Sequence, residues 1–476
     1  YNRFCNEKNR RIVLLVFSSL MFMCIFLPIV LIAYNLSKNL TYKNTVLIIA
    51  SLFFYAWGEP IWVVLLIFSA FVDYINGRII DKYYARAGAT IALVSSLVIN
   101  LGLLAMFKYS GFFIENINTF LHTSIPNPNF KLPIGISFYT FQTLSYTIDM
   151  YRGKTRVQKS FLGFLAYVSM FPQLVAGPIV RYSTVASELN SRRVTADDFA
   201  YGVKRFTTGM CKKVMLANSS GAVASMVLDS TRLTVASSWL GIIMYTFQIY
   251  FDFSGYSDMA IGLGRMLGFH FGENFEYPYI SRSITEFWRR WHISLSTFFR
   301  DYVYIPLGGN RYHAIRNIFI VWLLTGLWHG ASWNFIFWGL FYGVLLFIEK
   351  TLFKKKLQKI PAPFCYIYTM FFVILGWALF YFTDLNALWT FIKSAFGVGT
   401  ALYDLTAVST FCTNAWLIAV CVIASTPIPT IIHKNFCKKS KVFAAISEPV
   451  LVIVGLGVCF VLLVGQTYNP FLYFRF

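Results

Sequence analysis

Two histidines are the residues of this sequence best suited to chemistry. His329 lies inside residues 317–348, a run of 32 positions without one Asp, Glu, Lys or Arg, and His292 lies 37 positions earlier among aromatic residues. A neutral imidazole can accept and return a proton near neutral pH. A histidine within an apolar run usually faces protein or a water-filled cavity. Three roles are therefore open for His329: a packed structural residue, a proton relay or a catalytic base.

The segment that positions His329 is too long for one straight membrane crossing. A helix of these 32 residues would be about 48 Å long, whereas a bilayer core is about 30 Å thick. We therefore predict a break within residues 326–334. Glycines there permit close helix approach, and the polar Ser332 and Asn334 could line a cavity.

Residues 283–305 are predicted to form one interfacial helix. Ser283 and Glu286 have capping-box spacing, and Pro306 ends the helix. Apolar side chains recur every three or four positions and form one stripe: Ile284, Phe287, Trp288, Trp291, Leu295, Phe298, Phe299 and Tyr302. In this register His292 faces the packed side.

Arginines lie beside and just beyond this stripe: Arg289, Arg290, Arg300 and Arg311. A guanidinium group matches phosphate in two-point geometry. Two interpretations stay open, since these side chains could bind the phosphates of membrane lipid or those of a ligand.

The composition predicts a single polytopic membrane domain over residues 1–476. The chain is 57% hydrophobic, 19% aromatic and 13% charged, which is about half the charge of a soluble domain. Its uncharged runs predict about 9 to 12 membrane helices. The run 161–180 is one expected span, and the run 46–72 is expected to break at Gly58-Glu59-Pro60 because proline cannot continue a helix.

The charge pattern argues against nucleic acid as a partner. The formal charge is +21, but the basic residues are dispersed over many loops instead of forming one stripe. Lysine clusters at 350–359 and 434–441 predict a common cytoplasmic face.

The eight cysteines show no metal-ligand spacing, so no metal site is predicted and His433 is assigned no function. The acids Asp149, Asp252 and Asp258 are interpreted as structural carboxylates.

Several long motifs resemble a known family. Residues 325–339 read TGLWHGASWNFIFWG, residues 286–311 read EFWRRWHISLSTFFRDYVYIPLGGNR, and further matches lie at 132–153, 171–182 and 252–264. The chain closely resembles the membrane-bound O-acyltransferase (MBOAT) family, and best its bacterial branch of alginate and peptidoglycan O-acetyltransferase-type membrane subunits. Residues 1–14 are expected to be an N-terminal extension.

The resemblance implies an all-α bowl of transmembrane, re-entrant and interfacial helices around a central tunnel. It implies that His329 is catalytic and that His292 is the second conserved position. A histidine base would remove the proton of a hydroxyl that attacks a thioester. The oxyanion would then need donors, for which His292, Asn334 or a backbone N–H near Gly330 are candidates. Further candidates for the tunnel lining are Ser332, Tyr139, Gln142 and Gln248.

The resemblance also implies the substrates and the location. The donor is expected to be acetyl-CoA, bound as a substrate and not as a permanent cofactor, with its phosphates on Arg289, Arg290, Arg300 or Arg311. The acceptor is expected to be a hydroxyl outside the cell, on a polysaccharide or on the serine of a separate esterase-like partner. The expected location is the bacterial cytoplasmic membrane.

Two alternatives stay open. Within the family, the chain could transfer D-alanine from a carrier-protein thioester to teichoic acid, although PLGGNR at 306–311 favours the acetyltransferase branch. Outside the family, a transporter or flippase could use broken helices with His292 and His329 as a proton relay. The long motifs argue against this second alternative.

Overall fold

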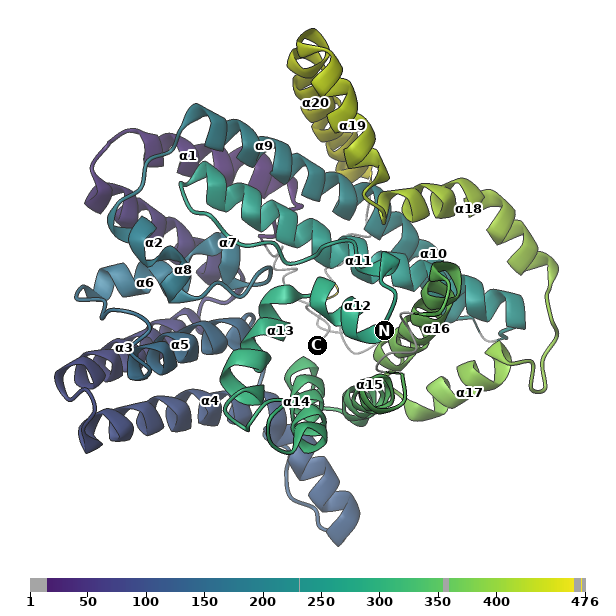
Figure 1. The fold of residues 1–476 in the computed structure, drawn as a ribbon, viewed down its shortest axis with the longest axis horizontal. Helices are drawn as coiled ribbons and strands as arrows, with labels where there is room; N and C mark the ends of the chain where they lie inside the picture. The colour runs from purple at the N-terminus through teal and green to yellow at the C-terminus, as the bar shows by residue number, and fades with distance from the viewer. Residues whose placement is uncertain (1–14, 231, 354–358, 466–471, 473–476) are drawn as a thin grey trace.

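A computed structural model describes residues 15–230, 232–353, 359–465 and 472. Within these residues the chain is helical, no sheet strand is present, and one isolated β-bridge joins Phe275 to Trp291. The predicted all-α class is confirmed. Figure 1 shows the helices arranged around α11, which runs through the middle of the molecule beside α9.

The helices of the first half surround one apolar core. In chain order they are η1 Phe22–Phe26, α1 Leu27–Asn35, α2 Leu40–Gly58, α3 Val63–Lys82, α4 Ala87–Leu121, α5 Ile136–Tyr151, α6 Phe161–Ser169, α7 Phe171–Leu174, α8 Tyr182–Asn190 and α9 Ala196–Cys211. The break between α2 and α3 follows Gly58, as expected. The expectation of one span at 161–180 is wrong, because α6 ends at Ser169 and α7 is a single turn that contains Pro172.

Most helices of the second half surround a second apolar core. In chain order the helices of this half are η2 Lys212–Ala217, α10 Asn218–Leu228, α11 Val235–Met266, η3 Pro278–Ile280, α12 Ile284–Arg290, α13 Ile293–Phe299, η4 Arg300–Tyr304, α14 Ala314–His329, α15 Trp333–Thr351, α16 Ala362–Tyr381, α17 Leu385–Ala395, α18 Leu405–Ala424, α19 Ile428–Lys439 and α20 Lys441–Gly465. Of these, α13, η4 and α20 pack on the first core instead. The α19–α20 hairpin projects from the body at the top of Figure 1.

The helix α11 joins the two cores. Its first half carries Tyr245 and Tyr250 of the second core, and its second half carries Tyr256 and Met259 of the first. Glycines let α9 lie directly against it, since a Cβ atom on Gly202 would come within 2.7 Å of the backbone oxygen of Gly262. The buried polar residues of α11 are therefore inside protein.

The protein is a multi-pass membrane protein. Among the described residues, five helices are long and apolar enough to cross a bilayer: α3, α4, α16, α18 and α20. Two shorter apolar helical segments are Phe22–Asn35 and Ala314–His329. Five is fewer than the expected 9 to 12, because other uncharged runs fold into shorter helices or, like α11, carry polar groups inside protein.

The acids in apolar surroundings have structural partners. The Oδ1 atom of Asp252 lies 2.6 Å from Nζ of Lys213, and both side chains are almost fully buried. Asp258 pairs with Lys212 at 2.7 Å, and Asp149 accepts a hydrogen bond from the Tyr302 hydroxyl at 2.9 Å. These contacts confirm the interpretation of all three acids as structural carboxylates.

Candidate active site

His329 is the last residue of α14 and stands at a break in the chain. Gly330 is extended, and α15 begins at Trp333, so the interruption falls inside the interval 326–334 in which it was expected. Gly326 and Gly339 bring the two helices into contact, because a Cβ atom on either would collide with a backbone carbonyl oxygen of the other helix. The helices α14 and α15 therefore pack closely against each other.

The imidazole of His329 is surrounded by aromatic rings. Ring centroids lie 5.0 Å away for Trp328, 5.0 Å for Trp338 and 5.2 Å for Phe380. The residue is nevertheless partly exposed, whereas Trp328 and Trp338 are buried. These rings fix the position of the imidazole and leave part of it accessible.

The end of α14 is held by two consecutive residues of α4. The last carbonyl groups of a helix have no partner within the helix. Nζ of Lys108 donates to the carbonyl oxygens of Trp328 and His329, the latter at 3.3 Å, and the Tyr109 hydroxyl donates to that of Leu327 at 2.6 Å. Sequence reasoning missed both residues. The available signal was a lysine that lies within the helix-length apolar segment of α4.

His292 lies at a second interruption, and the prediction of one continuous helix over 283–305 is wrong. The backbone leaves the helix at Trp291, and His292 adopts a left-handed conformation with φ 45°. The cause is pairing with a remote segment: Glu276 N–H donates to the Arg290 carbonyl, and Ile293 N–H donates to the Asn274 carbonyl, both at 3.0 Å. These bonds replace two helical ones.

The segment before His292 is anchored on α15. The carboxylate of Glu349 accepts hydrogen bonds from the backbone N–H groups of Ile284 at 2.6 Å and Thr285 at 2.8 Å. A carboxylate satisfies the free N–H groups at the start of a helix and interacts well with its dipole. The helix that follows His329 therefore also positions the turn that carries His292.

The two histidines meet at Trp328. The Trp328 ring centroid lies 6.0 Å from that of His292 and 5.0 Å from that of His329. His292 is only 1% exposed and packs edge-on against Phe253 at 4.7 Å. The packed orientation expected for His292 is confirmed, although the helical register that suggested it does not exist.

Comparisons with known proteins show the family of this chain. The model of the membrane-bound O-acyltransferase family matches residues 154–392, which include both histidines. The chain is 43% identical over 394 residues to a probable alginate O-acetylase AlgI of Pseudomonas aeruginosa, covering 81% of this chain and 76% of that protein. The chain belongs to the membrane-bound O-acyltransferase family.

Other relatives align with a larger share of this O-acyltransferase. A probable alginate O-acetylase AlgI of Pseudomonas putida is 37% identical over 488 residues, 97% of this chain and 100% of that protein. A peptidoglycan O-acetyltransferase of Helicobacter pylori is 34% identical over 435 residues, 83% of this chain and 82% of that protein. Relatives named teichoic acid D-alanyltransferase align with only about half of the chain.

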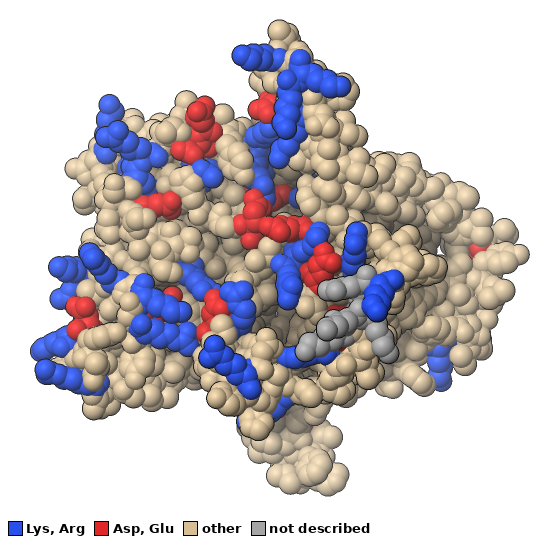
Figure 2. Space-filling model, in the orientation of Figure 1, with Lys and Arg blue, Asp and Glu red and all other residues tan. Residues whose placement is uncertain are grey.

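The four arginines of the acyltransferase have different surroundings. Arg290 pairs with Glu286 at 2.6 Å and Arg300 with Asp301 at 2.7 Å. Burial alone would raise the pKa of Asp301, but hydrogen bonds from Arg300 and Arg181 hold it below its ordinary value. Arg289 and Arg311 are exposed and form no ion pair with a described residue. Figure 2 shows basic side chains spread over this face among acidic ones.

The candidate tunnel residues are buried except for the half-buried Ser332, and several are already hydrogen-bonded within the protein. Asn334 accepts from Ser332 Oγ and donates to the Leu379 carbonyl at 3.3 Å, and Gln142 donates to the Gln173 carbonyl at 3.5 Å. Gln248 is buried on α11. Tyr139 is buried on α5, and its hydroxyl has no hydrogen-bond partner among the described residues. α5 borders the histidines through Phe141, whose ring stacks on Trp328 at 5.7 Å.

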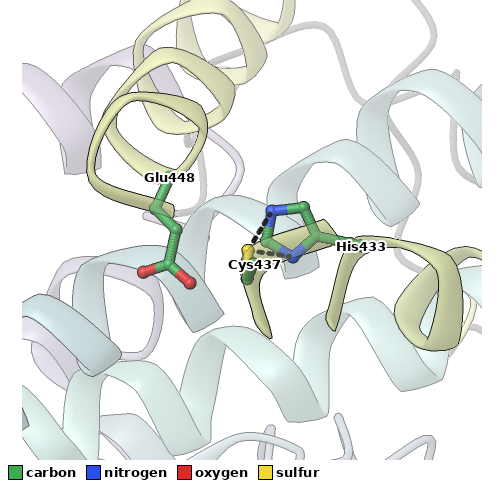
Figure 3. A group of neighbouring side chains, drawn as sticks. All are labelled: His433, Cys437 and Glu448. Carbon is green, nitrogen blue, oxygen red and sulfur yellow. Dashed lines mark hydrogen bonds between the residues drawn. The ribbon is translucent and has the colours of Figure 1, made fainter. Parts of the chain in front are cut away.

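A second group of polar side chains lies on the α19–α20 hairpin. His433, Cys437 and Glu448 place one potential ligand atom each within 4.8 Å of one another (Figure 3). Their spacing along the chain did not reveal the group, because Glu448 comes from another helix. Glu448 already pairs with Lys204, and α19 carries further lysines, so the local positive charge disfavours a bound cation. The hairpin and α14 lie on opposite sides of Figure 1.

Proposed function

We propose that this O-acyltransferase moves an acetyl group from cytoplasmic acetyl-CoA to an extracytoplasmic hydroxyl and so serves the O-acetylation of a cell-envelope or secreted polysaccharide. The main observation behind this proposal is that two imidazole rings contact the ring of Trp328. One of the two histidines is partly exposed and the other is buried. The bacterial cytoplasmic membrane is the location that this route requires. Relatives named for alginate and peptidoglycan O-acetylation support the acetyl group and the type of acceptor.

In the proposed reaction His329 acts as the general base. Its neutral imidazole removes the proton of the acceptor hydroxyl while the oxygen attacks the thioester carbonyl. A carbon–oxygen bond forms and the carbon–sulfur bond breaks. The imidazolium then returns the proton to the departing thiolate, so that the products are an ester and free coenzyme A. Partial exposure lets His329 meet both substrates.

The oxyanion of this reaction needs hydrogen-bond donors. The Gly330 N–H donates a hydrogen bond to the Gly326 carbonyl at 3.3 Å, and the Asn334 amide donates one to the Leu379 carbonyl. Both of these earlier candidates therefore have partners within the protein before substrate binds. An arriving oxyanion would have to compete with a carbonyl oxygen for either donor.

The phosphates of the donor are assigned first to Arg289 and Arg311. Both side chains are exposed and lack an ion pair with a described residue, whereas Arg290 and Arg300 are neutralised by neighbouring carboxylates. A guanidinium group already paired with a carboxylate attracts phosphate less strongly. The acceptor is assigned to a polysaccharide hydroxyl or to the serine of an esterase-like partner that then acetylates the polymer.

The test is acetyl transfer by the purified protein in liposomes with labelled acetyl-CoA on one side. Label should appear on an alginate or peptidoglycan fragment, or on the serine of a co-reconstituted partner, and His329→Ala should abolish it. His433→Ala, in the remote hairpin, is the matched control. Transport without any acyl product would support the transporter alternative. Transfer only from a D-alanyl carrier protein would support the teichoic acid alternative.

A further inference from the structure

Asn274 forms several hydrogen bonds with the turn that carries His292. Its backbone oxygen accepts from Ile293 N–H at 3.0 Å. Its side-chain Oδ1 accepts from the backbone N–H of Ser294 at 3.1 Å and from the Ser294 hydroxyl at 2.9 Å, and it lies 3.3 Å from Nδ1 of His292. Its Nδ2 donates to the hydroxyl of Ser257 on α11 at 3.1 Å. The asparagine itself is fully buried.

These bonds fix the orientation of the amide. A backbone N–H can only donate, so the side-chain atom that it meets is the oxygen. The other end of the amide is then the NH₂ group, and it has a hydroxyl acceptor in Ser257. Nδ1 of His292 therefore faces an oxygen that can only accept.

The second neighbour of Nδ1 is an acceptor as well. Ser294 Oγ lies 3.4 Å from Nδ1, and the proton of this hydroxyl is already donated to Asn274. Because both neighbours accept, Nδ1 of a neutral His292 must carry the hydrogen, which leaves Nε2 with a free lone pair. Nε2 is buried and forms no hydrogen bond with a described residue.

We propose that Asn274 is a positioning residue that holds His292 as the Nδ1–H tautomer and so leaves its Nε2 as a buried proton acceptor at the Trp328 ring that both histidines contact. In this state His292 cannot donate from Nε2 to an oxyanion. It is instead suited to take over from His329 the proton that His329 removes from the acceptor hydroxyl, and to return it through His329 to the departing thiolate. Oδ1 of Asn274 stabilises the imidazolium that exists in between. The catalytic part of this proposal rests on the proposed function; the tautomer does not.

The turn itself fits this role. The left-handed conformation is strained for a residue other than glycine, and His292 adopts it with φ 45°. The backbone N–H groups of Ile293 and Ser294, which donate to Asn274, hold the chain after that residue, and the bond from Glu276 N–H to the Arg290 carbonyl holds it before. The ring contacts of His292 are with Phe253, Phe275 and Trp328. The Trp328 ring is also contacted by two titratable groups, His329 of α14 at 5.0 Å and the ammonium group of Lys108 of α4 at 5.9 Å.

Nitrogen NMR of the full protein labelled in histidine tests the tautomer without reference to activity. The resonances of His292, assigned by their loss in His292→Gln, should show a protonated Nδ1 and a bare Nε2. Asn274→Leu should lose this preference, and Ser257→Ala, which removes only the partner of Nδ2, should keep it. A protonated Nε2 in the wild-type protein would overturn the proposal even if acetyl transfer proceeds as proposed.

The pH profile of acetyl transfer tests the catalytic part. Asn274→Asp keeps an acceptor at Nδ1 but adds a negative charge that favours imidazolium, so the neutral base is lost at a higher pH. The acid limb of kcat/KM should move upward by about one pH unit or more, while Ser257→Ala leaves it in place. An unshifted limb in Asn274→Asp would refute the role in proton transfer. Absence of acetyl transfer by the wild-type protein would instead refute the proposed function and leave the NMR result standing.

Discussion

Replacing Lys108 by methionine should disconnect the end of α14 from α4 and slow acetyl transfer. Lys108 is half-buried, and its ammonium group donates to two consecutive carbonyl oxygens, those of Trp328 and His329. Methionine has a similar length and fills the same space without a donor. The two carbonyls would then lose their partner at the residue that carries the proposed base.

The size of the effect follows from the bonds that are lost. A hydrogen bond from a charged group contributes about 1.5–3 kcal/mol, so two such bonds contribute at most about 6 kcal/mol. Relief of the desolvation of the ammonium group offsets part of this sum, and we expect a net loss of about 3 kcal/mol. If that loss appears in the positioning of His329 at the transition state, kcat falls about 100-fold.

The assay is steady-state acetyl transfer in liposomes, with kcat and the KM for acetyl-CoA measured separately. Lys108→Arg keeps a charged donor and should lose much less activity than Lys108→Met. Tyr109→Phe removes the neutral bond to Leu327 and should cost about 1 kcal/mol, or about fivefold. A Lys108→Met protein with wild-type kcat would refute the positioning argument, and a change in KM alone would place Lys108 at the donor instead.

Three further predictions concern the same site. His329→Ala should lower kcat by about 10²–10⁴-fold, the usual contribution of a general base, with the thermal unfolding midpoint nearly unchanged; wild-type turnover would remove His329 from catalysis. Arg289→Glu should raise the KM for acetyl-CoA, whereas Arg300→Glu, which loses its bond to Asp301, should mainly lower stability. Equal KM values in both variants and the wild type would favour the contact with lipid. Gly326→Ala should destabilise the protein by about 1–3 kcal/mol, because the new Cβ atom meets the Phe335 carbonyl. Gly457→Ala, which points into open space, is its control in a thermal unfolding assay, and equal midpoints would contradict the close packing of α14 on α15.

Features that depend on neighbours along the chain could be predicted from the sequence. Low charge and long apolar runs predicted a helical membrane protein, because a bilayer requires every backbone polar group to be satisfied within its own segment. The length of the 317–348 run, with its glycines, predicted the interruption beside His329. The family motifs predicted which two histidines are candidates for catalysis.

The tertiary structure decided how those histidines are held. The break at His292 depends on pairing with residues 274–276, and the local apolar periodicity favoured an unbroken helix. The end of α14 is held by a lysine 220 positions before Trp328. Arg290 lies four positions after Glu286 and Arg300 directly before Asp301 in the sequence, but only the folded geometry showed that they are paired. Helix periodicity records which side chains share a face, whereas hydrogen bonds between remote segments leave no periodic trace in the chain.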